Sequence, residues 1–120
     1  YGVDNEEVER NDYLKYLYIF NVFEKYNNDV LDLKVSTRSL SSGQMQKISF
    51  IRALLADSEI LLLDESTANL DEKSKNLIFE ILREQSITII NSTHDPDSFK
   101  DIDNHLRISI KDDSRLVTFN

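Results

Sequence analysis

Several residue types that commonly shape folds and sites are scarce or absent in this 120-residue chain. It has no cysteine or tryptophan, one proline, Pro96, and two glycines, Gly2 and Gly43. Without cysteine, disulfides, thiolate zinc sites and cysteine nucleophiles are all excluded. Two glycines this far apart cannot form Gly-x-x-x-x-Gly-Lys-Ser/Thr, the loop that holds phosphates through backbone N–H groups. A glycine that does occur inside a motif therefore carries weight.

Long hydrophobic runs and excess positive charge are also missing. No apolar stretch approaches the roughly 18 residues that cross a bilayer, and residues 1–12 are too polar and acidic for a signal peptide. Any membrane role is therefore expected to come from another segment or another chain. The net charge of −8 argues against a binder of phosphate backbones, so no nucleic acid partner is expected. Hydrophobic residues make up 40% of the chain, enough for a small core.

The first third of the chain predicts mainly helix. Helix is predicted from Asp4 to about Asn28, and a second helix is predicted to start near Asn11–Asp12. Asp4 followed by Glu7 is a loose capping box. A buried stripe is predicted from four residues at helical spacing: Val8, Leu14, Leu17 and Tyr18. The segment 27–39 reads as a connection with a short extended piece at Val30–Val35.

A further helix is predicted after Ser41–Ser42. Its apolar positions recur at helical spacing, and Lys47 and Arg52 fall elsewhere on its surface. The predicted core positions are Met45, Ile48, Ile51, Leu54 and Leu55.

The second half of the chain predicts alternating strands and helices. The uninterrupted run Ile60–Leu63 is typical of a strand buried on both faces of a parallel sheet. A helix over 72–83, burying Leu77, Ile78, Ile81 and Leu82, separates it from a second buried strand over 87–91. Pro96 opens a short helix with Asp95 as its cap. The tail over 106–119 predicts two strands around the turn at 111–114. The class is α/β.

Polar side chains follow both predicted central strands. Asp64 and Glu65 end the first strand, and His94 follows the second. Ligands gather at the carboxyl ends of strands in open α/β sheets, so the three side chains are expected at one edge. One carboxylate there can hold a hydrated Mg²⁺ and the other can orient a water. Each residue alone also has a structural explanation: Asp64 or Asp71 as a helix or turn cap, Glu65 as a solvated side chain, and His94 as a cap of the short helix that follows.

The segment Ser41-Ser42-Gly43-Gln44 is a second candidate site. Two hydroxyls and a glycine at a helix start, where backbone N–H groups are free, suit an anion. An ordinary Ser N-cap explains the same residues equally well.

Taken in order, these pieces resemble the ATP-binding cassette (ABC) ATPase family. Leu40 to Gln44 is similar to the signature motif Leu-Ser-Gly-Gly-Gln, and Ile60 to Asp64 to the Walker B strand with Glu65 after it. Ala68 to Asp71 resembles the D-loop and Thr93 to Asp95 the switch-histidine loop, while residues 51–55 are similar to Ala-Arg-Ala-Leu. The fold implied is part of a P-loop NTPase (RecA-like) parallel sheet, with an N-terminal helical subdomain and a C-terminal β-hairpin. The implied division is 1–58, the helical subdomain with the signature motif, and 59–120, the C-terminal part of the core.

The resemblance also implies roles for the matched residues. Asp64 is expected to bind Mg²⁺ through water, Glu65 to polarise the attacking water, and His94 to contact the γ-phosphate of ATP. Ser41, Ser42, Gly43 and Gln44 are expected to meet ATP held by the opposite subunit. Asp71 is expected to couple the two sites of the dimer.

Two departures from the family pattern qualify these roles. Ser42 replaces a glycine where backbone should approach phosphate. The Walker A loop and the glutamine loop are missing, so the chain is interpreted as a C-terminal, exporter-like piece that begins after the glutamine loop. By itself it is expected to bind ATP weakly and to be inactive.

The resemblance implies partners and a location as well. The expected partners are a second ABC ATPase domain and a transmembrane domain, at the cytoplasmic face of the membrane. Self-association through an exposed sheet edge is also expected. Two alternatives remain: a soluble ABC ATPase of DNA maintenance, which Gln44 and the −8 charge disfavour, and a degenerate, non-catalytic interaction module, for which Ser42 is the only support.

Overall fold

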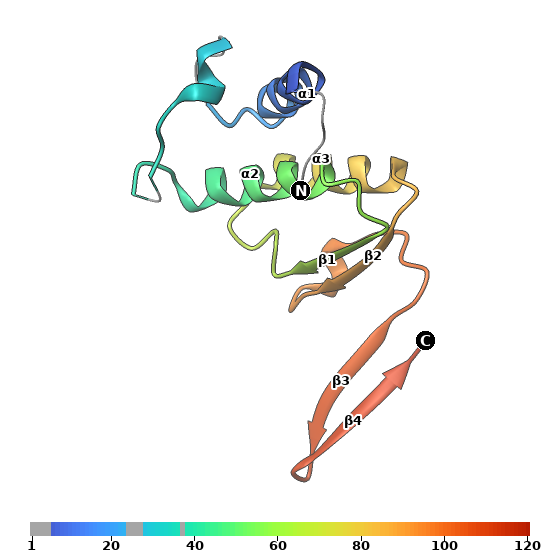
Figure 1. The fold of residues 1–120 in the computed structure, drawn as a ribbon. Helices are drawn as coiled ribbons and strands as arrows, with labels where there is room; N and C mark the ends of the chain where they lie inside the picture. Colours follow the sequence, from blue (N-terminus) through green and yellow to red (C-terminus); the bar gives the residue numbers. More distant parts are fainter. Residues whose placement is uncertain (1–5, 24–27, 37) are drawn as a thin grey trace.

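The computed structural model describes residues 6–23, 28–36 and 38–120, and these form three helices, two short 3-10 turns and four strands. In chain order the elements are α1 (Glu6–Ile19), η1 (Asn28–Asp32), α2 (Ser42–Leu54), β1 (Ile60–Asp64), α3 (Glu72–Glu84), β2 (Thr88–Ser92), η2 (Pro96–Ser98), β3 (Leu106–Lys111) and β4 (Ser114–Phe119). Helices α2 and α3 lie on one side of the β1–β2 pair, and the β3–β4 hairpin projects away from it (Figure 1). Mixed helices and strands with a small parallel sheet confirm the α/β class.

Helix α1 differs from its prediction. It runs through Asn11 and Asp12 without a break and ends at Ile19, well before residue 28. Leu17 is buried as expected, but Tyr18 is 69% exposed. Phe20 and Val22, just past the helix, are buried instead, because α1 ends in a left-handed turn at Asn21 (φ 47°) in which the Val22 N–H donates to the Leu17 carbonyl. Asp4 and the side chains of Glu7 and Val8 lie outside what the structure describes.

The connection after α1 also differs from its prediction. The extended piece expected at Val30–Val35 is wrong, because residues 28–32 form the 3-10 turn η1 and residues 33–36 are irregular. Arg10 of α1 pairs with Asp32 of this turn at 2.9 Å. Val30 lies in this turn and is buried in the core.

Helices α2 and α3 form where the sequence predicts them. Ser41 caps α2 in a full capping box: its hydroxyl accepts from Gln44 N–H, and the Gln44 side chain accepts from Ser41 N–H. Asp71 caps α3, whose buried residues Ser74, Ile78 and Leu82 recur every four positions and form one stripe. Both helices pack this way into the same core.

The central sheet is a parallel pair, with β1 and β2 in register from Ile60↔Thr88 to Asp64↔Ser92. Burial along β1 alternates, so the prediction of strands buried on both faces is wrong: Leu61 and Leu63 are buried, whereas Leu62 is 70% exposed. β2 likewise alternates between half-buried and exposed residues. The physical reason is that, in the described part of the chain, α2 and α3 cover one face of this sheet (Figure 1).

One cluster of buried side chains forms the core and draws on both halves of the chain. It contains Leu17, Phe20, Val22, Val30, Phe50, Ile51, Leu61, Leu63, Leu70, Ile78 and Leu82. Of the predicted α2 core positions, Ile51 is almost fully buried in this cluster, and Ile48, Leu54 and Leu55 pack against it partly buried, whereas Met45 is in neither group. The division of the chain at residues 58 and 59 stays a prediction.

The predicted C-terminal hairpin is confirmed. β3 and β4 pair antiparallel from Leu106↔Phe119 to Lys111↔Ser114. Asp112 and Asp113 form the two-residue turn with φ of 49° and 61°, the left-handed geometry that suits the twist of a tight hairpin. Every residue of both strands is exposed.

Candidate functional site

The carboxyl ends of β1 and β2 lie at the same edge of the sheet, because the two strands are parallel (Figure 1). Asp64 is the last residue of β1, opposite Ser92, and its side chain is exposed. Glu65 follows with φ of +45°, and its N–H donates to the Ser92 carbonyl at 2.9 Å. This left-handed turn redirects the chain directly after the strand.

Glu65 and His94 are in contact. His94 N–H donates to Glu65 Oε1 at 2.7 Å, and His94 Nε2 lies 3.9 Å from the same oxygen. The His94 side chain is 99% exposed and that of Glu65 41% exposed, so both can be reached from solvent. A carboxylate fixed by a backbone donor next to an open imidazole can accept a proton from a water and steer a bound anion.

Two buried polar atoms lie next to these residues in the sequence. In the described part of the chain, Ser66 Oγ and Asn91 Oδ1 are buried and have no hydrogen-bond partner. Ser66 directly follows Glu65, and Asn91 precedes Ser92, the partner of Asp64 in the sheet. Buried polar groups without partners are uncommon in native proteins, and a functional role is one of several explanations for them.

The second candidate group is the start of α2. Ser41 and Ser42 are exposed at the first turn, where the helix leaves N–H groups free and carries a positive partial charge. Gln44 ties this turn to the segment after α1, because its Nε2 donates to the Val22 carbonyl at 2.8 Å. The structure thus contains the Ser N-cap, and it leaves the exposed N–H end compatible with an anion as well.

Gly43 lies against the loop that connects β1 to α3. A Cβ built on Gly43 would come within 3.2 Å of the Asn69 carbonyl oxygen, a tight contact for any larger residue. Asn69 N–H in turn donates to Gln46 Oε1 at 3.2 Å. The start of α2 and the Glu65 edge are therefore joined through the loop 65–71.

Asp71 closes this loop as the N-cap of α3. Its carboxylate accepts from the Ser74 N–H at 2.9 Å and from the Ser74 hydroxyl at 2.8 Å. These two hydrogen bonds, the backbone one foremost, hold the pKa of Asp71 below its usual 3.8; partial burial opposes them and Lys47 adds to them. Lys47 Nζ lies 4.0 Å from Asp71 Oδ2, with its side chain only 14% exposed, so its prediction as an ordinary surface residue is wrong.

The sequence predicted no contact for three of these residues, Gln46, Lys47 and Asn69, although Asn69 lies in the D-loop-like segment 68–71. Gln46 and Lys47 lie just after the signature-like residues, yet nothing in their spacing names the loop as their partner. A polar pair directly following a helix-start motif is the only signal that could have suggested a contact.

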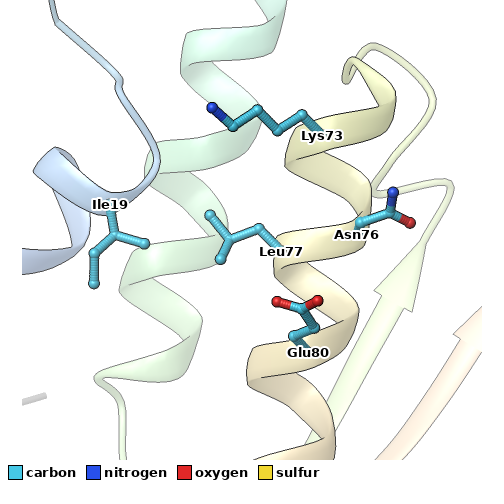
Figure 2. Close-up of a pocket in the computed structure, with 5 residues that line it drawn as sticks. All are labelled: Ile19, Lys73, Asn76, Leu77 and Glu80. Carbon is cyan, nitrogen blue, oxygen red and sulfur yellow. The ribbon is translucent and has the colours of Figure 1, made fainter.

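Near α1 and α3 there is also a surface hollow of about 570 Å³, lined by Ile19, Lys73, Asn76, Leu77 and Glu80 (Figure 2).

The described residues offer few side chains that could bind a metal ion together. Within the described ranges, no group of three or more His, Cys, Asp or Glu side chains lies close enough to hold a metal ion. Asp64 offers one exposed carboxylate, which suits a single water-mediated contact to Mg²⁺.

In the part of the chain that the structure describes, no helix is both long and apolar enough to cross a membrane.

Comparison with known proteins matches this arrangement to one family. The family model "ABC transporter" matches residues 5–68, just over half of the chain. The mating factor M secretion protein mam1 of Schizosaccharomyces pombe is 35% identical over 83% of this chain, and the alpha-factor-transporting ATPase of Saccharomyces cerevisiae is 42% identical over 69%. The methionine import ATP-binding protein MetN 1 of Lactiplantibacillus plantarum is 39% identical over 65%. The chain spans 8%, 6% and 22% of the lengths of these three relatives, respectively.

Proposed function

This chain belongs to the ABC transporter family of ATP-binding proteins, and from that premise we propose that it forms the C-terminal part of an ATPase domain that drives transport across a membrane. The observation that supports the proposal best is the pairing of Glu65 with His94 at the carboxyl edge of the sheet. Relatives named for secretion and for import both match, so the direction of transport is left open.

Glu65 is the candidate catalytic carboxylate. The His94 N–H fixes one of its oxygens at 2.7 Å and leaves the other available to orient a water and accept its proton. The exposed His94 ring is suited to contact a phosphoryl oxygen. Asp64 is proposed to contact Mg²⁺ through water, and the bound ion would neutralise charge on the phosphates. Because the described residues contain no cluster of three or more metal-binding side chains, we propose that the ion's other ligands come from ATP, water and further protein segments.

The start of α2 is proposed to serve a second nucleotide. Ser41, Ser42, Gly43 and Gln44 present the exposed N-terminal turn of a capped helix, which suits an anionic γ-phosphate from an opposing ATPase domain. Asp71, at the far end of the loop that touches Gly43, is proposed to couple the two sites of such a dimer. The proposed partners are therefore a second ABC ATPase domain and a transmembrane domain, with this chain at the cytoplasmic face of the membrane.

This chain by itself is proposed to bind ATP only weakly and not to hydrolyse it. Its 120 residues contain no Gly-x-x-x-x-Gly-Lys-Ser/Thr, the element that holds phosphates in ATPases of this kind. Isothermal titration of the chain with MgATP is expected to give a dissociation constant in the millimolar range or no binding. A micromolar constant would refute this part of the proposal.

Association between copies is proposed to use the open sheet. In the parallel pair, the sides of β1 and β2 that face away from each other lie outside the hydrogen-bond ladder. One face of the pair also exposes the side chains of Ile60, Leu62 and Ile90. Light scattering at rising protein concentration should give an increasing mass. A constant monomer mass at the highest concentration would contradict it.

Replacing Glu65 tests the catalytic proposal. In the complete gene product, assembled with its membrane partner, Glu65→Gln should abolish ATP turnover and leave ATP binding intact, because the amide keeps the shape but cannot accept a proton. Glu59→Gln is the matched control: Glu59 is an exposed acid at the opposite end of β1 and should leave turnover unchanged. Turnover that survives Glu65→Gln would refute the role of Glu65. An unmodified protein that binds ATP without turning it over would instead favour a regulatory, non-catalytic partner.

A further inference from the structure

The loop 65–71 is held at three places by three different elements. At its start, the Glu65 N–H donates to Ser92 of β2 at 2.9 Å. In its middle, the Asn69 N–H donates to Gln46 of α2 at 3.2 Å. At its end, Asp71 caps α3 through Ser74. The loop joins β1 to α3, so the α3 anchor belongs to an element at its own end, whereas the β2 and α2 anchors come from elements that the loop does not connect.

In the middle of the loop, Thr67 and Leu70 are buried, and two backbone hydrogen bonds are local. Ala68 N–H donates to the Glu65 carbonyl at 3.2 Å and Leu70 N–H to the Thr67 carbonyl at 3.1 Å, so both bonds are internal to the loop. Asn69 lies between them, exposed, with its N–H directed to the Gln46 side chain and its carbonyl against Gly43. Asn69 is thus hydrogen-bonded to α2 through Gln46, and its carbonyl lies close to Gly43 of the same helix.

The contacts of α2 extend in the other direction too. Gln44 connects the same helix start to the Val22 carbonyl beyond α1. Lys47, one residue after Gln46, approaches the Asp71 carboxylate at 4.0 Å. A displacement of the α2 start would therefore be felt at the middle and the end of the loop that begins at Glu65.

We propose that Gln46 is a positioning residue that fixes the loop 65–71 to the start of α2, so that the Ser41–Gln44 turn and the Glu65 carboxylate move as one unit. The inference rests on the proposed function for its catalytic consequence, and on the Gln46–Asn69 and Gly43–Asn69 contacts for its mechanical part. An anion bound at the helix start would then act on the orientation of Glu65 through Asn69. Gln46 itself is not assigned to either binding group.

The chemistry of the contact specifies which substitutions preserve it. Gln46 uses its Oε1 as an acceptor toward a backbone N–H. Glu keeps that acceptor and the length of the side chain, whereas Leu keeps a similar volume and removes the acceptor. Gln46→Glu should therefore preserve the anchor that Gln46→Leu removes.

The mechanical part is tested on this chain by ¹H–¹⁵N NMR. In the unmodified protein the Asn69 amide should exchange with solvent slowly because its N–H donates to Gln46. Gln46→Leu should accelerate Asn69 exchange about 2- to 10-fold, the range expected for losing one net hydrogen bond. Gln46→Glu should restore slow exchange. Ser49→Leu, at an exposed position of the same helix, is the control and should leave Asn69 unchanged. Asn69 exchange that is equal in the Leu and Glu variants would overturn the proposal.

The catalytic part is tested on the complete gene product with its membrane partner. Gln46→Leu should lower kcat for ATP about 2- to 10-fold with KM nearly unchanged, and Gln46→Glu should recover most of it. If Glu65→Gln abolishes turnover while Gln46→Leu leaves kcat intact, this inference fails and the proposed function survives. If Glu65→Gln itself has no effect, the proposed function fails, and the NMR experiment still decides whether Gln46 anchors the loop.

Discussion

Replacing Asp71 should destabilise the chain by removing the cap of α3. Both carboxylate oxygens are engaged, one by the Ser74 N–H at 2.9 Å and one by the Ser74 hydroxyl at 2.8 Å. Ser74 is buried, so Asp71→Ala leaves its donors without these acceptors in a place that water reaches poorly. An N-cap contributes about 0.5–2 kcal/mol, and two interrupted bonds favour the upper part, about 1–2 kcal/mol of unfolding free energy.

This contribution should depend on pH in a defined direction. The Ser74 hydrogen bonds hold the folded-state pKa of Asp71 below 3.8. A group whose pKa is lowered on folding stabilises the protein above its unfolded pKa and loses that contribution as the pH falls through its folded pKa. The stability difference between the unmodified chain and Asp71→Ala should therefore be constant from pH 7 to 5 and shrink below about pH 4.

Urea unfolding followed by circular dichroism at pH 7, 5 and 3 measures this difference. Asp71→Asn, which keeps an acceptor at the cap but cannot titrate, should cost less than Asp71→Ala at pH 7. Asp103→Ala, at an exposed acid far along the chain, is the control and should stay within about 0.5 kcal/mol at each pH. The cap argument is refuted if Asp71→Ala matches the unmodified chain at pH 7, or if the difference is as large at pH 3 as at pH 7.

Three further outcomes are expected from other parts of the structure. Gly43→Ala should change stability by less than about 1 kcal/mol, because alanine's helix preference offsets its crowding of Asn69, yet it should shift the Asn69 amide in NMR spectra. Ile78→Ala should cost about 2–5 kcal/mol in urea unfolding because Ile78 is almost fully buried, whereas Ile90→Ala on the open sheet face should cost less than about 1. Arg10→Ala should cost at most about 1 kcal/mol, and 0.5 M salt should reduce that cost, because its ion pair is exposed on both sides.

The parts of the fold that follow from local signals could be predicted from the sequence. Ser41 followed by Gln44 three residues later specifies a capping box, and α2 begins there. Asp71 before a run with apolar residues at helical spacing specifies α3 in the same way. The turn Asp112–Asp113 between two β-forming segments specifies the hairpin. In each case the decisive interaction lies within a few residues of the chain.

The failures have a common cause in tertiary contacts. The aromatic stretch around Tyr18 has no clear periodicity, so the sequence could not show that α1 ends at Ile19 and that Phe20 and Val22 carry the burial. Val30 is β-branched and reads locally as extended, yet packing beneath α1 favours the 3-10 turn η1. Local conformational preference determines the structure of such segments only where tertiary packing does not override it.

The candidate site likewise has a part that could be predicted from the sequence and a part that could not. That Glu65 and His94 would meet was predictable, because parallel strands end at one edge whatever their side chains. That Gln46 would bind Asn69 was not, because the contact joins positions 23 residues apart and depends on how α2 sits over the loop. Residue types in a motif can therefore be read from sequence, while the side chains that align the motifs with one another require the packed structure.

The exposed face of the β1–β2 pair gives a physical reason to expect association between copies of the chain. A strand with one face in water ordinarily alternates apolar and polar residues, yet β1 begins with the sequence Ile-Leu-Leu-Leu. Leu62 is consequently 70% exposed, and Ile60 and Ile90 lie on the same open face. Exposing these side chains forgoes about 1.5–3 kcal/mol each compared with burying them. A sequence that specifies two-sided burial, on a sheet covered on one side, therefore favours a second layer over this face, and that is the physical basis for expecting the chain to associate there.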